Sequence, residues 1–172
     1  MSRSASMKTR IAMWLVFVAT PPIAGRLLLD PLLGLRCNPI LCAALGAALL
    51  GLAVRAAAVT GRYLAVYGEA RRGVPRRLVT VGPYSCMRHP MHLFLSLVPV
   101  ASGLLAASPG GALLGLVFAA AVLVFAVTVD EAEARRLFGE AYEEYRRRVP
   151  AFNLDPRCLA KALGPRPPRR RG

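Results

Sequence analysis

Five polar residues stand where two long apolar segments begin or end. They are Arg88, His89 and His92 at the start of one segment, and Asp130 and Glu131 at the end of the next. An arginine offers a fork of N–H donors to a carboxylate, a histidine ring can carry a proton near neutral pH, and the acidic pair can accept hydrogen bonds. Charged groups at such a depth in a membrane cost free energy, so they are a functional hypothesis by default.

The apolar segments that would position these residues are long enough to cross a bilayer. The chain has 172 residues, 55% of them hydrophobic, and a mean hydropathy of +0.45, which is more apolar than a soluble domain of this size. A spanning helix needs roughly 20 mainly apolar residues. We therefore predict an all-α, polytopic membrane protein with about four transmembrane helices. The four segments are Ile11–Leu29, Pro39–Val59, Met91–Ala107 and Ala112–Val129.

The last two apolar segments are joined by Ser108-Pro109-Gly110-Gly111. This composition is typical of a tight turn, because proline presets one backbone dihedral and glycine allows the left-handed conformation. We expect the two segments to form an antiparallel hairpin. Such a hairpin would bring the group around Arg88 and the group around Glu131 to one face of the membrane, where they would form a composite site.

Lysine and arginine residues are unevenly distributed among the connections. Twenty precede the first apolar segment, separate the second from the third or follow the fourth, whereas the alternate loops hold only Arg26 and Arg36. This asymmetry predicts that both termini and the middle loop are cytoplasmic. The net charge of +14 also favours contact with anionic lipid headgroups. We expect no nucleic-acid partner, because no recognition module accompanies the arginines, and the short arginine-rich chain suggests a bacterial inner membrane.

The first apolar segment has two interpretations. A basic start, the apolar run 11–20 and the following Pro-Pro-Ile-Ala-Gly are similar to a secretory signal. Apolar residues resume at 27–29 and 32–33, so the hydrophobic region is longer than a signal core. We favour a retained first helix and keep a cleaved signal as the alternative.

The four cysteines do not show a metal-binding pattern. They are Cys37, Cys42, Cys86 and Cys158, with no Cys-x-x-Cys pair, and the chain has only two histidines. We therefore expect no metal site. A Cys37–Cys42 disulfide is one alternative, but we favour four cysteines that act as small buried hydrophobic residues.

The C-terminal region divides into a helix and a tail. An apolar stripe at helical spacing predicts one cytoplasmic helix over 130–149, which would continue the fourth span and end before Pro150. Residues 157–172 are rich in proline and arginine, and we expect them to be disordered. The domain prediction is a single membrane-embedded domain over 1–156 with a basic tail. The stripe consists of Phe138, Tyr142, Tyr145 and Val149.

Two ordered series of residues resemble the isoprenylcysteine carboxyl methyltransferase and phospholipid methyltransferase superfamily. The similarity covers roughly residues 60–156. These enzymes are integral membrane proteins that use S-adenosylmethionine. The first series is Gly82-Pro83-Tyr84 and Arg88-His89-Pro90-Met91-His92, and the second is Asp130-Glu131, Phe138-Gly139, Tyr142, Tyr145 and Val149-Pro150.

The resemblance implies a cofactor pocket and a catalytic pair. His89 and Glu131 would be the catalytic residues and would also line the S-adenosylmethionine pocket with Arg88. A fork of donors on Arg88 would suit the carboxylate of the cofactor. The remaining pocket residues implied by the resemblance are Tyr84, Pro90, His92 and Asp130.

The chain departs from the family pattern at its acidic pair and its second histidine. His92 stands where the family usually has tyrosine, and Asp130-Glu131 replaces a pair of glutamates. Both changes keep the polarity, so we expect cofactor binding to survive them. Prenylcysteine methyltransferases have an arginine just before the acidic pair, whereas Phe125–Val129 contains none. The methyl acceptor is therefore left open.

The sequence as a whole predicts an integral membrane methyltransferase that uses S-adenosylmethionine and acts on a lipophilic small molecule or lipid. One alternative is a non-catalytic small membrane protein, such as a transporter or scaffold subunit, that keeps the fold. A membrane reductase is a further alternative, although no glycine-rich phosphate cradle is visible. The sequence predicts neither the oligomeric state nor the atom that is methylated.

Overall fold

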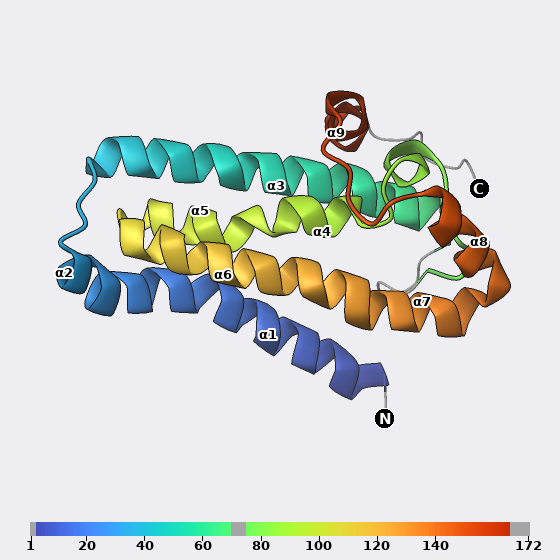
Figure 1. Ribbon diagram of the computed structural model, residues 1–172, viewed down its shortest axis with the longest axis horizontal. Helices are drawn as coiled ribbons and strands as arrows, with labels where there is room; N and C mark the ends of the chain where they lie inside the picture. Colours follow the sequence, from blue (N-terminus) through green and yellow to red (C-terminus); the bar gives the residue numbers. More distant parts are fainter. Residues whose placement is uncertain (1–2, 70–74, 166–172) are drawn as a thin grey trace. The chain divides into compact units, whose positions relative to one another are not determined.

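The computed structural model of the protein describes residues 3–69 and 75–165, which are helical apart from their connections (Figure 1). The all-α fold class is therefore confirmed for the described residues. The chain forms two compact units, each assembled from separated parts of the sequence. A single domain over 1–156 stays a prediction. The first unit comprises residues 1–51 and 96–121, and the second comprises residues 52–95 and 122–172.

The helices of the first unit approach each other closely at glycine residues. A Cβ on Gly103 would collide with the backbone of Ala112, and one on Gly115 would collide with the backbone of Pro99. This close approach shows that the two helices form the predicted antiparallel hairpin. The elements of the unit are α1 (Arg3–Ala24), η1 (Gly25–Leu29), α2 (Asp30–Leu33), the first part of α3 (Pro39–Tyr67), α5 (Leu97–Leu105) and most of α6 (Pro109–Phe125).

The connection inside this hairpin is shorter than the sequence predicts. Pro109, Gly110 and Gly111 form the first turn of α6, because proline suits the first position of a helix. Asp30 Oδ1 accepts a hydrogen bond from Gly110 N at 2.6 Å, and Ser108 Oγ accepts one from Gly111 N at 2.9 Å. These oxygens satisfy N–H groups that a helix leaves unpaired at its start.

The second unit contains every residue that the sequence analysis selected as a site residue. The short 3₁₀ helix η2 precedes α4, and the π-helical turn η3 joins α6 to α7 without a break. Turns of the π type occur often at functional sites. The elements of the unit are the last part of α3, η2 (Gly82–Ser85), α4 (Pro90–Leu95), the end of α6, η3 (Ala126–Asp130), α7 (Glu131–Phe138), α8 (Glu140–Arg148) and α9 (Pro156–Leu163).

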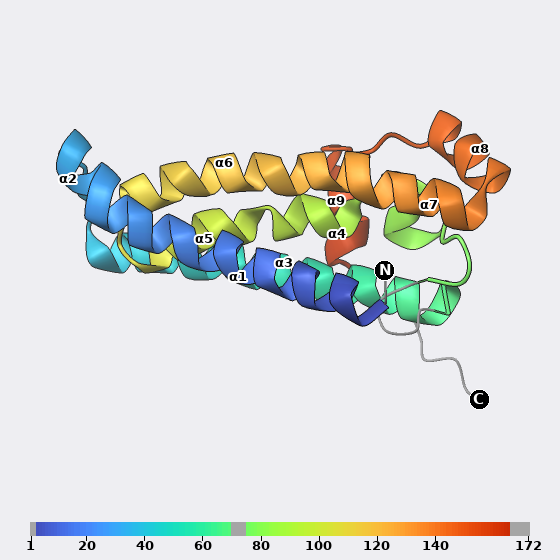
Figure 2. The ribbon, with the colours of Figure 1, turned by 90° about the horizontal axis from the view of Figure 1, so that it is seen from below.

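The helix predicted over 130–149 is broken into α7 and α8. Gly139 separates them with φ 55° and ψ −129°, a conformation that residues with a side chain rarely adopt. Figure 2 shows that α8 folds back from the end of α7. Because of this bend, the end of α8 approaches the loop that precedes α4.

The tail is helical over most of its described length, which corrects the prediction of disorder from residue 157. The Asp155 side chain caps the start of α9 by accepting a backbone N–H at 2.7 Å. The carbonyls at its end accept hydrogen bonds from the Arg55 guanidinium of α3 at 3.1 and 2.9 Å. Both ends of α9 therefore have partners for their backbone groups. Residues 166–172 lie outside the described part of the chain.

The interpretation of the cysteines as separate hydrophobic residues is wrong. Cys37 and Cys42 form a disulfide in the first unit, and Cys86 and Cys158 form one in the second. The members of the second pair are 72 residues apart. Sequence reasoning could not join them, because only the packing of α9 against η2 brings them together.

Within residues 3–69 and 75–165, three helices are long and apolar enough to cross a membrane, namely 14–33, 39–67 and 109–138. The fourth predicted span, Met91–Ala107, corresponds to the shorter apolar stretch Pro90–Leu105, so a count of four is not confirmed. This stretch is divided between α4 and α5 because Pro99 has no N–H to donate to the carbonyl one turn earlier.

Candidate functional site

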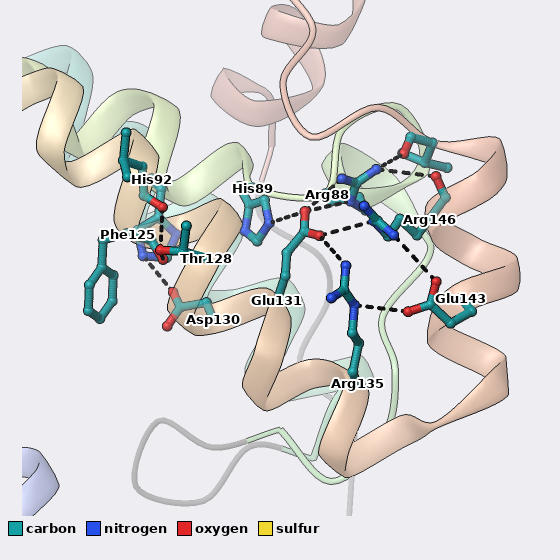
Figure 3. Close-up of polar contacts among 12 residues, drawn as sticks. Arg88, His89, His92, Phe125, Thr128, Asp130, Glu131, Arg135, Glu143 and Arg146 are labelled. Atoms are coloured by element: carbon teal, nitrogen blue, oxygen red, sulfur yellow. Dashed lines mark hydrogen bonds and ion pairs between the residues drawn. The ribbon is translucent and has the colours of Figure 1, made fainter.

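The carboxylate of Glu131 lies at the centre of a buried polar cluster in the second unit. Glu131 is only 2% exposed, although its side chain is charged. Glu131 Oε1 accepts hydrogen bonds from Arg88 Nε at 3.1 Å and Nη2 at 2.6 Å, and it lies 3.2 Å from His89 Nε2 (Figure 3). The structure thus brings together Arg88, His89 and Glu131, as the sequence predicts.

Three residues that the sequence analysis did not select as site residues complete the cluster. Glu131 Oε2 lies 3.2 Å from Arg146 Nε and 3.7 Å from Arg135 Nη2. Glu143 joins the same two arginines, at 2.9 Å to Arg135 Nε and 3.5 Å to Arg146 Nη1. With Arg88, three guanidinium groups face two carboxylates, so the cluster has one positive charge in excess. The helical spacing of Glu131 and Arg135 was a usable signal for one of the three residues.

Most N–H donors of the Arg88 guanidinium form hydrogen bonds to other groups of the protein. Besides Glu131, it donates through Nη1 to the carbonyl of Arg146 at 3.2 Å and to the carbonyl of Val149. These carbonyls belong to the end of α8, where a helix leaves carbonyls without partners. Arg88 is therefore a clamp between Glu131 and the end of α8. This geometry does not favour the predicted fork toward a cofactor carboxylate, because most N–H donors of Arg88 are already bonded.

The chain after α8 covers the loop that carries His89. Arg88 N donates to Pro150 O at 2.9 Å, and His89 N donates to Ala151 O at 3.1 Å. The ring of Phe152 lies 5.9 Å from the His89 ring, measured between centroids. The His89 ring is consequently buried between this segment and Glu131.

Burial lowers the pKa of His89 below its usual range, despite the hydrogen bond with Glu131 that acts in the opposite direction. The physical reason is that a buried ring loses the hydration that would stabilise its charged form, and this loss outweighs the attraction of Glu131 and Asp130. The ring is then neutral at pH 7 and donates its Nε2–H to the carboxylate.

This neutral histidine predicts the direction in which pH changes stability. The unfolded chain binds a proton at His89 near pH 6.5, whereas the folded chain does so only at lower pH. We expect the melting temperature in detergent to fall as the pH is lowered from 7.5 to 5.5, and His89→Gln to weaken this dependence. A melting temperature that rises on acidification would contradict a neutral His89.

His92 and Asp130 form a second polar pair next to the cluster. His92 Nε2 lies 3.0 Å from Asp130 Oδ2, and both side chains are partly exposed, at 22% and 18%. Figure 3 shows this pair on the side of His89 opposite to Arg146. The rings of His89 and His92 are 5.9 Å apart. Asp130 is the last residue of η3, so the π-helical turn determines its direction.

A family model described as phospholipid methyltransferase matches residues 36–141 of the chain. The chain belongs to this family. The match contains Arg88, His89 and the acidic pair, but it ends before Arg146. A comparison with curated proteins found no match, and neither did a comparison with solved structures.

The tyrosines of the family series have different positions around the cluster. Tyr84 is buried in η2, and its carbonyl accepts a hydrogen bond from Tyr145 Oη at 2.6 Å, which is a structural contact. Pro90 is buried and begins α4. Tyr142 is buried next to the charges of Glu131 and Arg88. Its hydroxyl is buried without a hydrogen-bond partner among the described residues.

Proposed function

We propose that the protein is a membrane methyltransferase that uses S-adenosylmethionine to methylate a lipophilic small molecule or a lipid. The observation that supports it best is the buried Glu131 carboxylate, bonded to both Arg88 and His89 within the segment that matches the family. A buried charge is retained at a considerable desolvation cost, and such sites are typical of function.

The cluster fits the charged end of S-adenosylmethionine. The excess positive charge suits the cofactor carboxylate, and Arg135 and Arg146 are better placed for it than Arg88. Both are partly exposed, at 42% and 44%, and one terminal nitrogen of each has no ion-pair partner within the described residues. The buried hydroxyl of Tyr142 offers a donor that a ligand would satisfy. Glu131 and the neutral His89 remain the proposed catalytic residues.

S-adenosylmethionine would supply an electrophilic methyl group on a sulfonium sulfur. The residues of this chain would mainly hold the reactants in line, and such alignment can be worth about 7–11 kcal/mol. His89 and Phe152, whose ring centroids lie 5.9 Å apart, would exclude water from the reacting atoms. The lipophilic acceptor would enter from the lipid phase, and the cofactor would enter from the arginine-rich side, which we propose is cytoplasmic in a bacterial inner membrane.

The direct test of this proposal is binding of the cofactor to the purified full-length protein. We expect S-adenosylmethionine to raise the melting temperature progressively, because a ligand at 100 times its Kd stabilises by about 2.7 kcal/mol. His89→Ala should weaken the shift, whereas Thr128→Val, an exposed change on η3, should leave it intact. No shift at millimolar cofactor would favour the non-catalytic scaffold.

A further inference from the structure

We infer that His92 and Asp130 are the proton-accepting pair for the methyl acceptor, and that the acceptor therefore has a proton on its reacting atom. This inference rests on the proposed function. The resemblance placed His92, Asp130 and Glu131 in one cofactor pocket. The inference instead gives His92 and Asp130 a role separate from that of Glu131.

The geometry of the pair is that of a carboxylate orienting an imidazole. Asp130 Oδ2 lies 3.0 Å from His92 Nε2, so the carboxylate favours the tautomer with a hydrogen on Nε2. Nδ1 then has the free lone pair and can accept a proton. The same carboxylate would stabilise the positive charge that the ring gains. His92 is thus equipped as a base and not only as a hydrogen-bond donor.

The position of the pair separates it from the carboxylate cluster. Asp130 and Glu131 are consecutive, so their side chains leave the helix about 100° apart. His92 lies in α4, three residues after His89 of the preceding loop, and Asp130 precedes Glu131 on the side of the apolar end of α6. The pair therefore lies between the charged cluster and the apolar residues. A lipophilic acceptor would present its reacting group there.

Titratable groups face His92 from two neighbouring segments. Asp130 faces it from η3, and the neutral His89 faces it from the preceding loop at 5.9 Å between ring centroids. Glu131 on α7 is bonded to His89 and to Arg88 instead. His92 and Asp130 are also more exposed than Glu131, at 22% and 18% against 3% for the side chains. A substrate can therefore reach the pair more easily than the buried carboxylate.

The proton balance defines the substrate class. The reacting atom of the acceptor forms a bond to the methyl carbon, and the carbon–sulfur bond breaks with its electron pair left on the sulfur. The proton of the acceptor passes to His92 Nδ1 and later to solvent. Hydroxyl, thiol, and primary or secondary amine acceptors need such a base. A carboxylate or a tertiary amine does not, because it has no proton to lose.

The experiment compares three variants of the full-length protein in membranes from expressing cells. Transfer of labelled methyl groups from S-adenosylmethionine to the lipid extract is measured for His92→Gln, Asp130→Asn and the control Thr128→Val. We expect about a 10²-fold loss in the first two, which is typical of a lost general base, and no change in the control. The melting-temperature shift with S-adenosylmethionine should be unchanged in all three.

A second readout does not depend on turnover. The ¹⁵N spectrum of the protein with labelled histidine should show His92 as the Nε2–H tautomer, and Asp130→Ala should convert it to a mixture. Unchanged tautomers, unchanged transfer or a weakened cofactor shift in His92→Gln would each overturn the inference. So would a labelled methyl ester or quaternary ammonium product. Absence of any cofactor shift in the wild-type protein would instead refute the proposed function.

Discussion

Glu131→Gln is expected to weaken S-adenosylmethionine binding and to lower the free energy of unfolding by about 3–5 kcal/mol. The side chain is 3% exposed and holds Arg88, which is 10% exposed. Replacing the carboxylate with a neutral amide leaves three guanidinium groups facing only Glu143. The positive charge of Arg88 would remain buried without a compensating anion, which is far more costly than losing a surface pair.

The matched control is Glu144→Gln on α8. Its partner is Arg148 at 2.8 Å, but the two side chains are 61% and 70% exposed. We expect a change in stability of less than about 1 kcal/mol and an unchanged cofactor shift. Melting temperatures of both variants in the same detergent measure the contrast. Equal effects of the two substitutions would show that Glu131 is not the centre of a buried network.

Arg88→Lys is the second substitution with a large expected effect, although it keeps the positive charge. One guanidinium bonds Glu131 and two carbonyls at the end of α8, and a lysine ammonium cannot reach all three in one geometry. We expect a loss of about 1.5–3 kcal/mol in stability, the range for a hydrogen bond to a charged group. The end of α8 should also exchange its amide hydrogens faster.

Hydrogen exchange at residues 146–151 distinguishes a lost clamp from a lost charge. Arg148→Lys is the control, because Arg148 is 70% exposed and bonds only to Glu144 among the described residues. We expect this control to change neither the exchange nor the cofactor shift. Protection at residues 146–151 that survives Arg88→Lys would mean that the backbone pairs with Pro150 and Ala151 hold α8 without the guanidinium.

The helical fold and the part of the cluster formed by Arg88, His89 and Glu131 could be predicted from local sequence. An apolar run of about membrane length has few conformations other than a helix, because a bilayer cannot form hydrogen bonds with exposed backbone groups. Polar residues at the ends of two such runs are conspicuous for the same reason. Arg88, His89 and Glu131 could therefore be selected together, and the structure brings them within hydrogen-bond distance.

The part of the cluster formed by Glu143 and Arg146 could not be predicted in the same way. Arg146 and Glu143 belong to an arginine- and glutamate-rich helix whose composition is that of any solvated surface. Their approach to Glu131 depends on the backbone conformation of Gly139, which turns α8 back from α7. Gly139 was recognisable as a weak helical position, but the direction of the bend is a tertiary property. The pairing of Cys86 with Cys158 is also a tertiary property, because the two cysteines are 72 residues apart in the sequence.

The sequence by itself determined which residue types stand at the ends of the apolar segments and that the elements holding them are helices, because hydrophobic length and helical period are local properties. The tertiary structure decided what those residues bond to. It directed Arg88 into the protein as a clamp, added Arg135 and Arg146 to Glu131, and paired His92 with Asp130. The physical reason is that partner choice depends on the directions in which consecutive side chains leave bent or π-helical segments.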